Sequence, residues 1–249
     1  MSRIGWGSIA LAGVIGAVWL PARADQSAKP SPVASVAELA KEAESSMERL
    51  GEYLGSPESY TSAQEERVPQ AAGLLACVAE ALVEHPDRKK SKIAAVALRN
   101  AAVHLAESDS FKTATAAYKA AKQAMTGQPA GTVHKTTGWK NLVSMDVSMK
   151  VMESRSNRLR RGLRRFRHPQ RDSRHAVALV LLGRAMRAGT DDLDSPKEIA
   201  QWKKFSDDYL SATTALAIAM RNKDKAGAKK QHVRIMKSCK DCHDVFRDN

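Results

Sequence analysis

The sequence predicts an all-α protein made of two tandem four-helix bundles, and three observations support that prediction. From about Ser35 onward the chain is rich in the helix formers Ala, Lys, Glu, Leu, Met and Arg, while aromatic residues make up 5% of it. No segment keeps up the period-two alternation of polar and apolar residues that indicates a strand. A break at 126–138, with three glycines and one proline, divides the helical pattern into two sets of four.

Residues 1–24 are expected to be a signal peptide that is removed from the mature protein. Arg3 gives a positive start, an apolar run extends to Leu20, and an Ala-x-Ala sequence ending at Ala24 matches the cleavage preference of signal peptidases. The apolar run is also about as long as a short transmembrane helix, so an uncleaved membrane anchor is the alternative. We therefore expect an exported protein, periplasmic or otherwise outside the cytoplasm.

The N-terminal bundle is predicted over residues 36–126. Residues 25–35 read as a linker, because Pro30 and Pro32 hold the chain extended. Pro69 fits only the first turn of a helix, which sets the start of the second one. The predicted helices of this bundle span 36–55, 68–85, 88–107 and 110–125.

The C-terminal bundle is predicted over residues 139–249, after a linker at 127–138. Ser195 followed by Pro196 is a favourable cap and first residue for its third helix. The predicted helices of this bundle span 139–166, 173–188, 196–221 and 224–247.

The two helix sets also resemble each other in sequence. At an offset of 104 residues Cys77 falls on Leu181, and at an offset of 114 Met125 falls on Cys239. A tandem duplication would explain both overlays, although Ala-rich helices also align by composition alone. The overlay predicts that Cys77 is a small buried apolar residue and that the first copy has lost its chemistry.

Two of the three cysteines lie beside a histidine near the C-terminus. Cys239, Cys242 and His243 are spaced i, i+3 and i+4, so on a helix their side chains leave one face and can reach one flat ligand. This Cys-x-x-Cys-His pattern is typical of c-type haem attachment, with two thioethers to the porphyrin and the imidazole on the iron.

Three other readings of the motif stay open at the level of sequence. Zinc could be held if His232 joined the three motif residues, but no second close pair of ligands follows at a usual spacing. A thioredoxin-like redox pair needs a βαβ setting, which this chain does not offer. The third reading is a chance occurrence in a long helix.

The segment "CKDCHDVFR" at 239–247 resembles the C-terminal helix of class II c-type cytochromes, the cytochrome c-prime and cytochrome c556 family. The resemblance covers roughly residues 139–249, and its specific part is the last eleven. It implies a four-helix bundle with one covalent haem c near its C-terminal end, attached outside the cytoplasm, and dimers are common in the family. It also implies that His243 is the proximal ligand and that Arg247 lies near the haem edge; alternatively, Arg247 simply complements the helix dipole.

The sixth iron ligand would decide between electron transfer and gas binding. Met145, Met149 and Met152 are spaced i, i+4 and i+7, which predicts a stripe facing the bundle interior. "MKVM" at 149–152 resembles the methionine-bearing segment of low-spin family members, which makes Met149 the first choice and Met152 the second. Methionine stripes are also common core filler. The N-terminal bundle has no cysteine pair and is expected to carry no haem.

Charge narrows the classes of partner. Removing Arg3 and Arg23 from 40 basic residues leaves 38 against 27 acidic ones, a net charge of +11. Nine arginines stand between Arg155 and Arg174, and they could steer an acidic redox partner, meet haem propionates, contact lipid headgroups or form a solvated face. Nucleic acid is not expected, since Phe166 is the only aromatic residue there to stack on bases.

The sequence therefore predicts an exported c-type cytochrome that transfers single electrons and is not an enzyme. Phosphate loops, nucleophile elbows and paired catalytic carboxylates are missing from the sequence. One alternative function is a five-coordinate haem protein that binds gases such as nitric oxide. The other is a non-redox helical scaffold of the envelope with a degenerate motif.

Overall fold

The computed structural model describes residues 33–128 and 138–247, all within one compact unit. The predicted signal peptide at 1–24, most of the predicted linkers at 25–35 and 127–138, and residues 248–249 lie outside the described residues.

Within those ranges the protein is all-helical and contains no strand, which confirms the predicted fold class. The elements in chain order are α1 Val36–Tyr53, α2 Pro57–Thr61, α3 Arg67–Glu84, the 3-10 helix η1 Arg88–Lys90, α4 Ala95–Ala106, α5 Phe111–Met125, α6 Met145–Arg165, α7 Pro169–Ala188, α8 Pro196–Arg221 and α9 Lys225–Phe246.

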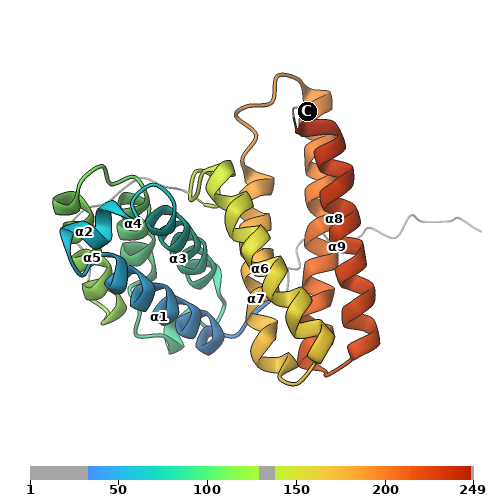
Figure 1. The fold of residues 1–249 in the computed structure, drawn as a ribbon, viewed down its shortest axis with the longest axis horizontal. Helices are drawn as coiled ribbons and strands as arrows, with labels where there is room; N and C mark the ends of the chain where they lie inside the picture. Colours follow the sequence, from blue (N-terminus) through green and yellow to red (C-terminus); the bar gives the residue numbers. More distant parts are fainter. Residues whose placement is uncertain (1–32, 129–137, 248–249) are drawn as a thin grey trace, which may run out of the picture. The chain divides into compact units, whose positions relative to one another are not determined.

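Long helices that follow one another in the chain pack side by side, as expected for up-and-down bundles. In the first half α1 packs on α3, α3 on α4 and α4 on α5; in the second half α6, α7, α8 and α9 follow the same order (Figure 1). α9 also contacts α6, which closes the second set, and α3 contacts both α6 and α7.

Serine caps set the helix starts that the sequence predicted best. Ser35, Ser110 and Ser195 each form a reciprocal capping box, in which the hydroxyl accepts from the backbone N–H three residues on. Such a cap satisfies backbone donors that would otherwise lack partners at the helix start. The start of α8 at Pro196 and its end at Arg221 are confirmed.

The predicted helix over 88–107 is wrong in its first half. Residues 88–90 form only the short helix η1, and α4 does not begin until Ala95. The backbone N–H of Ala94 donates to the Ala124 carbonyl at the end of α5, at 2.9 Å, so a tertiary hydrogen bond holds the chain away from the helical path.

Other boundaries move for local reasons. Ser56 caps α2, a helix of five residues that the sequence pattern did not predict. α6 begins at Met145 and not at 139, because the Ser144 hydroxyl accepts from the Val147 N–H and caps the helix there. α7 begins at Pro169, four residues earlier than predicted, with proline at its first position.

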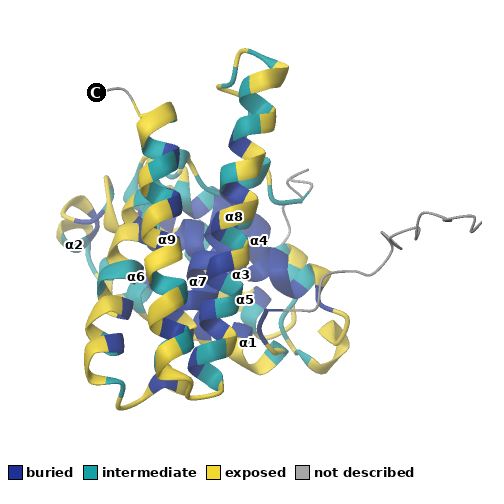
Figure 2. Cartoon of the chain, turned by 90° about the vertical axis from the view of Figure 1, so that its right-hand side faces the viewer, coloured by how far each residue is buried: buried dark blue, intermediate teal, exposed yellow. Residues whose placement is uncertain are grey.

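Two central helices, α3 and α7, are buried along most of their length, as Figure 2 shows. Cys77 on α3 is fully buried, as predicted, and burial followed by the nearby Glu80 carboxylate raises the pKa of its thiol far above the usual range. Cys77 is therefore a packing residue, inert toward chemistry near neutral pH.

None of the helices in the described ranges has the length and apolar character needed to cross a membrane.

Candidate functional site

The Cys-x-x-Cys-His motif lies on the last two turns of α9. The Asp224 carboxylate caps that helix by accepting from the Gly227 N–H at 2.9 Å. Cys242 is 9% exposed, whereas Cys239 and His243 are half-buried. No described residue hydrogen-bonds the His243 ring, so neither imidazole nitrogen is tied to another described residue.

A cluster of aromatic rings anchors the motif end of α9 to α8. The Phe246 ring meets Trp202 edge-on at 5.3 Å between centroids and Phe205 at 6.3 Å. The indole N–H of Trp202 donates to the Met186 carbonyl on α7 at 2.9 Å. Edge-to-face pairs add to apolar burial, so three helices fix the position of the motif.

Both motif thiols are protonated near neutral pH. Burial raises the pKa of Cys239, and burial together with the neighbouring Cys239 raises the pKa of Cys242 to about 11. A thioredoxin-like pair requires a lowered thiol pKa. This environment, without a strand in the described ranges, argues against the redox-pair reading.

The geometry of the described residues gives no support to the zinc reading. No three His, Cys, Asp or Glu side chains of the described residues converge as a metal site, so His232 does not complete a ligand set with the motif. The His232 Nε2 is buried without a hydrogen-bond partner, and burial followed by Arg160 lowers the pKa of its ring. His232 therefore stays neutral near pH 7.

The face of α9 that carries Cys239 and His243 is turned toward α6. Met236 lies one turn before Cys239 on that face, and its sulfur accepts a hydrogen bond from the Ser156 hydroxyl of α6 at 3.7 Å. α6 and α9 are antiparallel (Figure 1). His243 follows Met236 by seven residues on α9, which is a rise of about 10 Å along the helix. Met149 precedes Ser156 by seven residues on α6, which is the same rise toward the same end of the bundle. Met149 thus lies at the level of His243.

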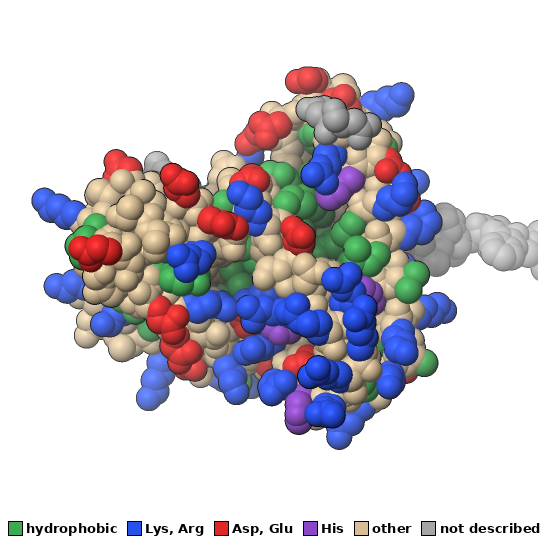
Figure 3. All heavy atoms as spheres, viewed as in Figure 1, with side chains coloured by type: hydrophobic (Ala, Val, Ile, Leu, Met, Phe, Trp, Pro, Cys, Tyr) green, Lys and Arg blue, Asp and Glu red, His purple; other side chains and the backbone are tan. Residues whose placement is uncertain are grey.

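The predicted methionine stripe faces inward in part. Met152 is 8% exposed, and Met145 and Met149 are half-buried against the core. The ribbons of α6 and α9 diverge toward the motif end, and Figure 3 shows hydrophobic side chains lining a hollow between them. Met236, one turn before Cys239 on α9, is 48% exposed. An apolar, partly open face with two thiols and one imidazole suits a haem group.

Arg247 follows α9 as its C-cap. Its backbone N–H donates to the His243 carbonyl at 3.1 Å, and its guanidinium is exposed. That position allows a cation to complement the helix dipole, the alternative that the sequence left open.

The basic stretch is less uniform than the sequence predicted. Arg155 is 6% exposed, where its guanidinium contacts the Glu42 carboxylate of α1 and donates to His175 Nδ1 at 3.1 Å. Arg155 therefore belongs to a buried contact between α1, α6 and α7, whereas the later arginines of the stretch are exposed.

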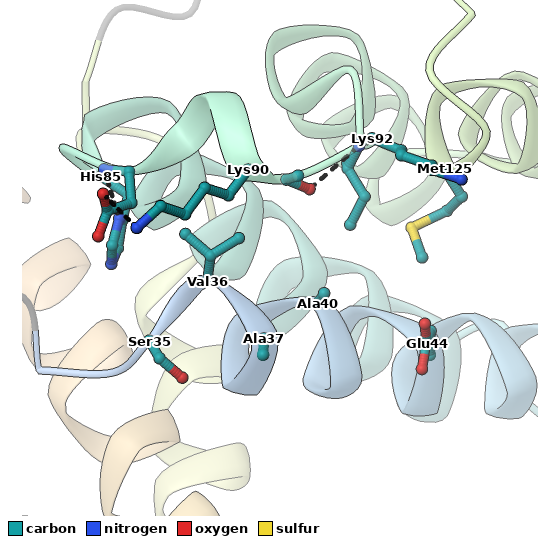
Figure 4. Close-up of a pocket in the computed structure, with 12 residues that line it drawn as sticks. Ser35, Val36, Ala37, Ala40, Glu44, His85, Lys90, Lys92 and Met125 are labelled. Carbon is teal, nitrogen blue, oxygen red and sulfur yellow. Dashed lines mark hydrogen bonds and ion pairs between the residues drawn. The ribbon is translucent and has the colours of Figure 1, made fainter.

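A pocket also lies away from the motif. A cavity of about 530 Å³ lies between the start of α1, the chain after α3 and Met125 at the end of α5 (Figure 4). His85 on its wall uses both ring nitrogens, accepting from the Asp87 N–H at 3.0 Å and donating to the Ala34 carbonyl at 3.1 Å. We assign the functional site to α9, because chemistry-bearing side chains converge there and do not converge in this cavity.

Sequence reasoning missed the α8 side of the site. Trp202, Phe205 and Tyr209 all lie near the motif, and Tyr209 is close enough to Cys239 for the two groups to affect each other's charge. Their spacing of i, i+3 and i+7 placed them on one helix face and could have indicated an aromatic wall.

Comparison with known proteins places the last two helices in a family context. Residues 196–247 match the family model described as cytochrome c', and this range contains α8 and the whole Cys-x-x-Cys-His motif. The match supports a relationship between this region and class II c-type cytochromes, and it indicates a haem-binding domain. No curated protein and no solved structure matches the chain.

Proposed function

We propose that the protein is an exported c-type cytochrome that carries one haem on α9 and transfers single electrons. The observation behind this proposal is the placement of Cys239, Cys242 and His243 on one partly open face, inside the range that matches the cytochrome c' model. The N-terminal bundle, without such a motif, carries no haem in this proposal.

The residues of α9 would have distinct tasks. Cys239 and Cys242 would hold the haem covalently, each thiol adding its sulfur to one carbon of a vinyl group and its hydrogen to the other. The His243 imidazole would bind the iron, and no hydrogen bond to a described residue competes for its ring nitrogens. Haem held in this way supplies a ferric/ferrous couple, whose potential depends on axial ligands and on burial.

Met149 is the proposed sixth ligand, with Met152 as the alternative. The antiparallel register that follows from the Ser156–Met236 contact supports Met149, because it lies level with His243 across the hollow. Thioether ligation would give a low-spin centre suited to electron transfer, whereas a vacant position would suit small gases.

The exposed arginines after Arg155 support an acidic redox partner. Like-signed charge over α6 steers an oppositely charged protein toward it, and that attraction weakens as salt increases.

Mass spectrometry of the protein from a host that matures c-type cytochromes tests the proposal. The C-terminal peptide should carry the mass of one porphyrin, and the haem absorbance should survive acid-acetone extraction. A colourless chain would leave only the scaffold reading. Met149→Ala should convert a low-spin spectrum to high-spin, with Met145→Ala as the matched control; a starting spectrum that is already high-spin would contradict thioether ligation and favour gas binding.

A further inference from the structure

A second cluster of polar side chains lies away from the haem motif, where α1, α3 and α6 meet. A pocket of about 110 Å³ opens there. Its polar lining consists of four arginines and two uncharged residues: Arg49, Arg67, Arg155, Arg158, Gln70 and Ser154. Figure 3 shows Lys and Arg side chains crowded over this part of α6.

Positive charge exceeds negative charge at this pocket. Glu42 contacts Arg155 and lies 3.9 Å from Arg49, so one carboxylate serves two guanidinium groups. Glu66 accepts from Gln70 at 3.0 Å at the rim, and Arg158 has no ion-pair partner among the described residues. An anion is the missing counter-charge.

The pocket is held in shape before any ligand arrives. The Arg67 guanidinium donates to the Ser62 carbonyl at 2.7 Å and lies over the Tyr53 ring, 5.4 Å from its centroid. Arg155 is buried and bonded on both sides, to Glu42 and to His175. Donors fixed in this way lose little conformational entropy when they bind a ligand.

Neighbouring groups respond to the excess of positive charge. Burial lowers the pKa of Arg155, the Glu42 carboxylate raises it in part, and the adjacent Arg49 and Arg158 lower it again. Burial and the surrounding arginines, Arg155 first, lower the pKa of His175 to about 3. In both cases burial is the main cause, and the neighbouring arginines act in the same direction.

We propose that this pocket binds a small tetrahedral oxyanion of the phosphate class. Its volume is several times what one water needs, yet well below the roughly 300 Å³ at which sites for drug-sized ligands begin. Guanidinium groups match phosphate oxygens with paired N–H donors. Because Arg49 and Arg67 belong to the N-terminal helices and Arg158 to α6, the anion bridges the two bundles. The site does not depend on haem.

Thermal unfolding of the full chain, followed by far-ultraviolet circular dichroism, tests the proposal. Inorganic phosphate is titrated against chloride at equal ionic strength. At tenfold excess over the dissociation constant, phosphate should raise the Tm by about 3–6 °C. Arg158→Gln and Arg49→Gln should abolish the rise, whereas Arg164→Gln, an exposed arginine of the same helix outside the pocket, should keep it.

Either of two results of the phosphate titration would overturn the proposal. One is a phosphate effect no larger than that of chloride. The other is an equal effect in Arg158→Gln and in the parent protein. Vesicles of anionic phospholipid at the same phosphate concentration should raise the Tm of the parent protein no more than that of Arg49→Gln or Arg158→Gln, because the pocket is too small for a headgroup with its glycerol. A rise in Tm that is lost in these variants would refute a free anion as the ligand.

Discussion

The two bundles use the same frame and differ at the end of their last helix. Each has a serine-capped first helix and a second helix buried along most of its length. At the end of α5 the buried residues are alanines, Ala121 and Ala124, which let helices approach closely. The end of α9 carries thiols, an imidazole and the Phe246 ring. The frame is thus independent of the chemistry, which depends on a few side chains of one helix.

The helix pairs that close the bundles differ in the same way. In the first bundle the Tyr118 hydroxyl of α5 donates to the Met47 carbonyl of α1 at 3.2 Å. The 114-residue overlay places His232 of α9 at the position of Tyr118, and its Nε2 has no partner. The cavity of about 530 Å³ beside Met125 lies at the end of the first bundle that corresponds to the motif end of the second. The first bundle keeps an opening there, but no motif lines it.

Replacing the motif thiols should have the largest effect. Cys239→Ala combined with Cys242→Ala should abolish covalent haem completely, because no sulfur remains to form a thioether. Cys77→Ala, a buried cysteine of the first bundle, is the control and should keep full haem content. Intact-mass spectrometry measures both. Haem retained in the double variant, or lost in the control, would break the proposed division of labour between the bundles.

Removing the carboxylate between the bundles should cost about 3–5 kcal/mol of unfolding free energy. Glu42→Gln leaves the buried Arg155 without a counter-charge. Glu80→Gln, which breaks the buried pair with Arg99 inside the first bundle, is the matched control and should cost a similar amount. Urea unfolding measures both, and only Glu42→Gln should separate the transitions of the two bundles. If Glu42→Gln unfolds in one transition at the same urea concentration as the parent protein, Glu42 does not couple the two bundles.

The buried His175, next to Arg155, should make the protein less stable as the pH becomes acidic. The folded-state pKa of His175 is lowered from 6.5 to about 3, so the unfolded chain takes up a proton first and stability falls as pH decreases below about 6.5. Between pH 6.5 and 5 the loss from this group is about 2 kcal/mol. His175→Gln should flatten that part of the curve. Urea unfolding at a series of pH values measures this, and a curve for His175→Gln equal to that of the parent protein would refute the assignment.

The smallest expected effect comes from adding one methyl group at a helix contact, which should cost more stability in the second bundle than in the first. A Cβ at Gly183 on α7 would lie 3.0 Å from the buried Tyr209 ring, so Gly183→Ala should destabilise by about 1–2 kcal/mol. At Gly51 on α1 it would meet the Tyr118 hydroxyl, which can move, and the gain in helix propensity should offset the loss. Thermal unfolding compares the two, and a larger loss for Gly51→Ala would contradict this reading.

Features set by neighbouring residues were predictable from the sequence, and features set by distant ones were not. The spacing of Cys239, Cys242 and His243 depends only on helix geometry. The serine caps at 35, 110 and 195 act within one turn. The break before α4 depends on the hydrogen bond from Ala94 to Ala124, and the pairing of Arg155 with Glu42 joins residues 113 positions apart. Charge density alone could not show that one arginine of a basic run is buried.

Helix α6 takes part in both of the sites inferred from this structure. Met149 and Arg155 are six residues apart on it, about 9 Å along a stiff rod. A small turn of that rod about its axis would therefore move the thioether facing the hollow and the guanidinium held by Glu42 in a single motion. A group bound at the Met149 sulfur and an anion held beside Arg155 would therefore both act on the same helix.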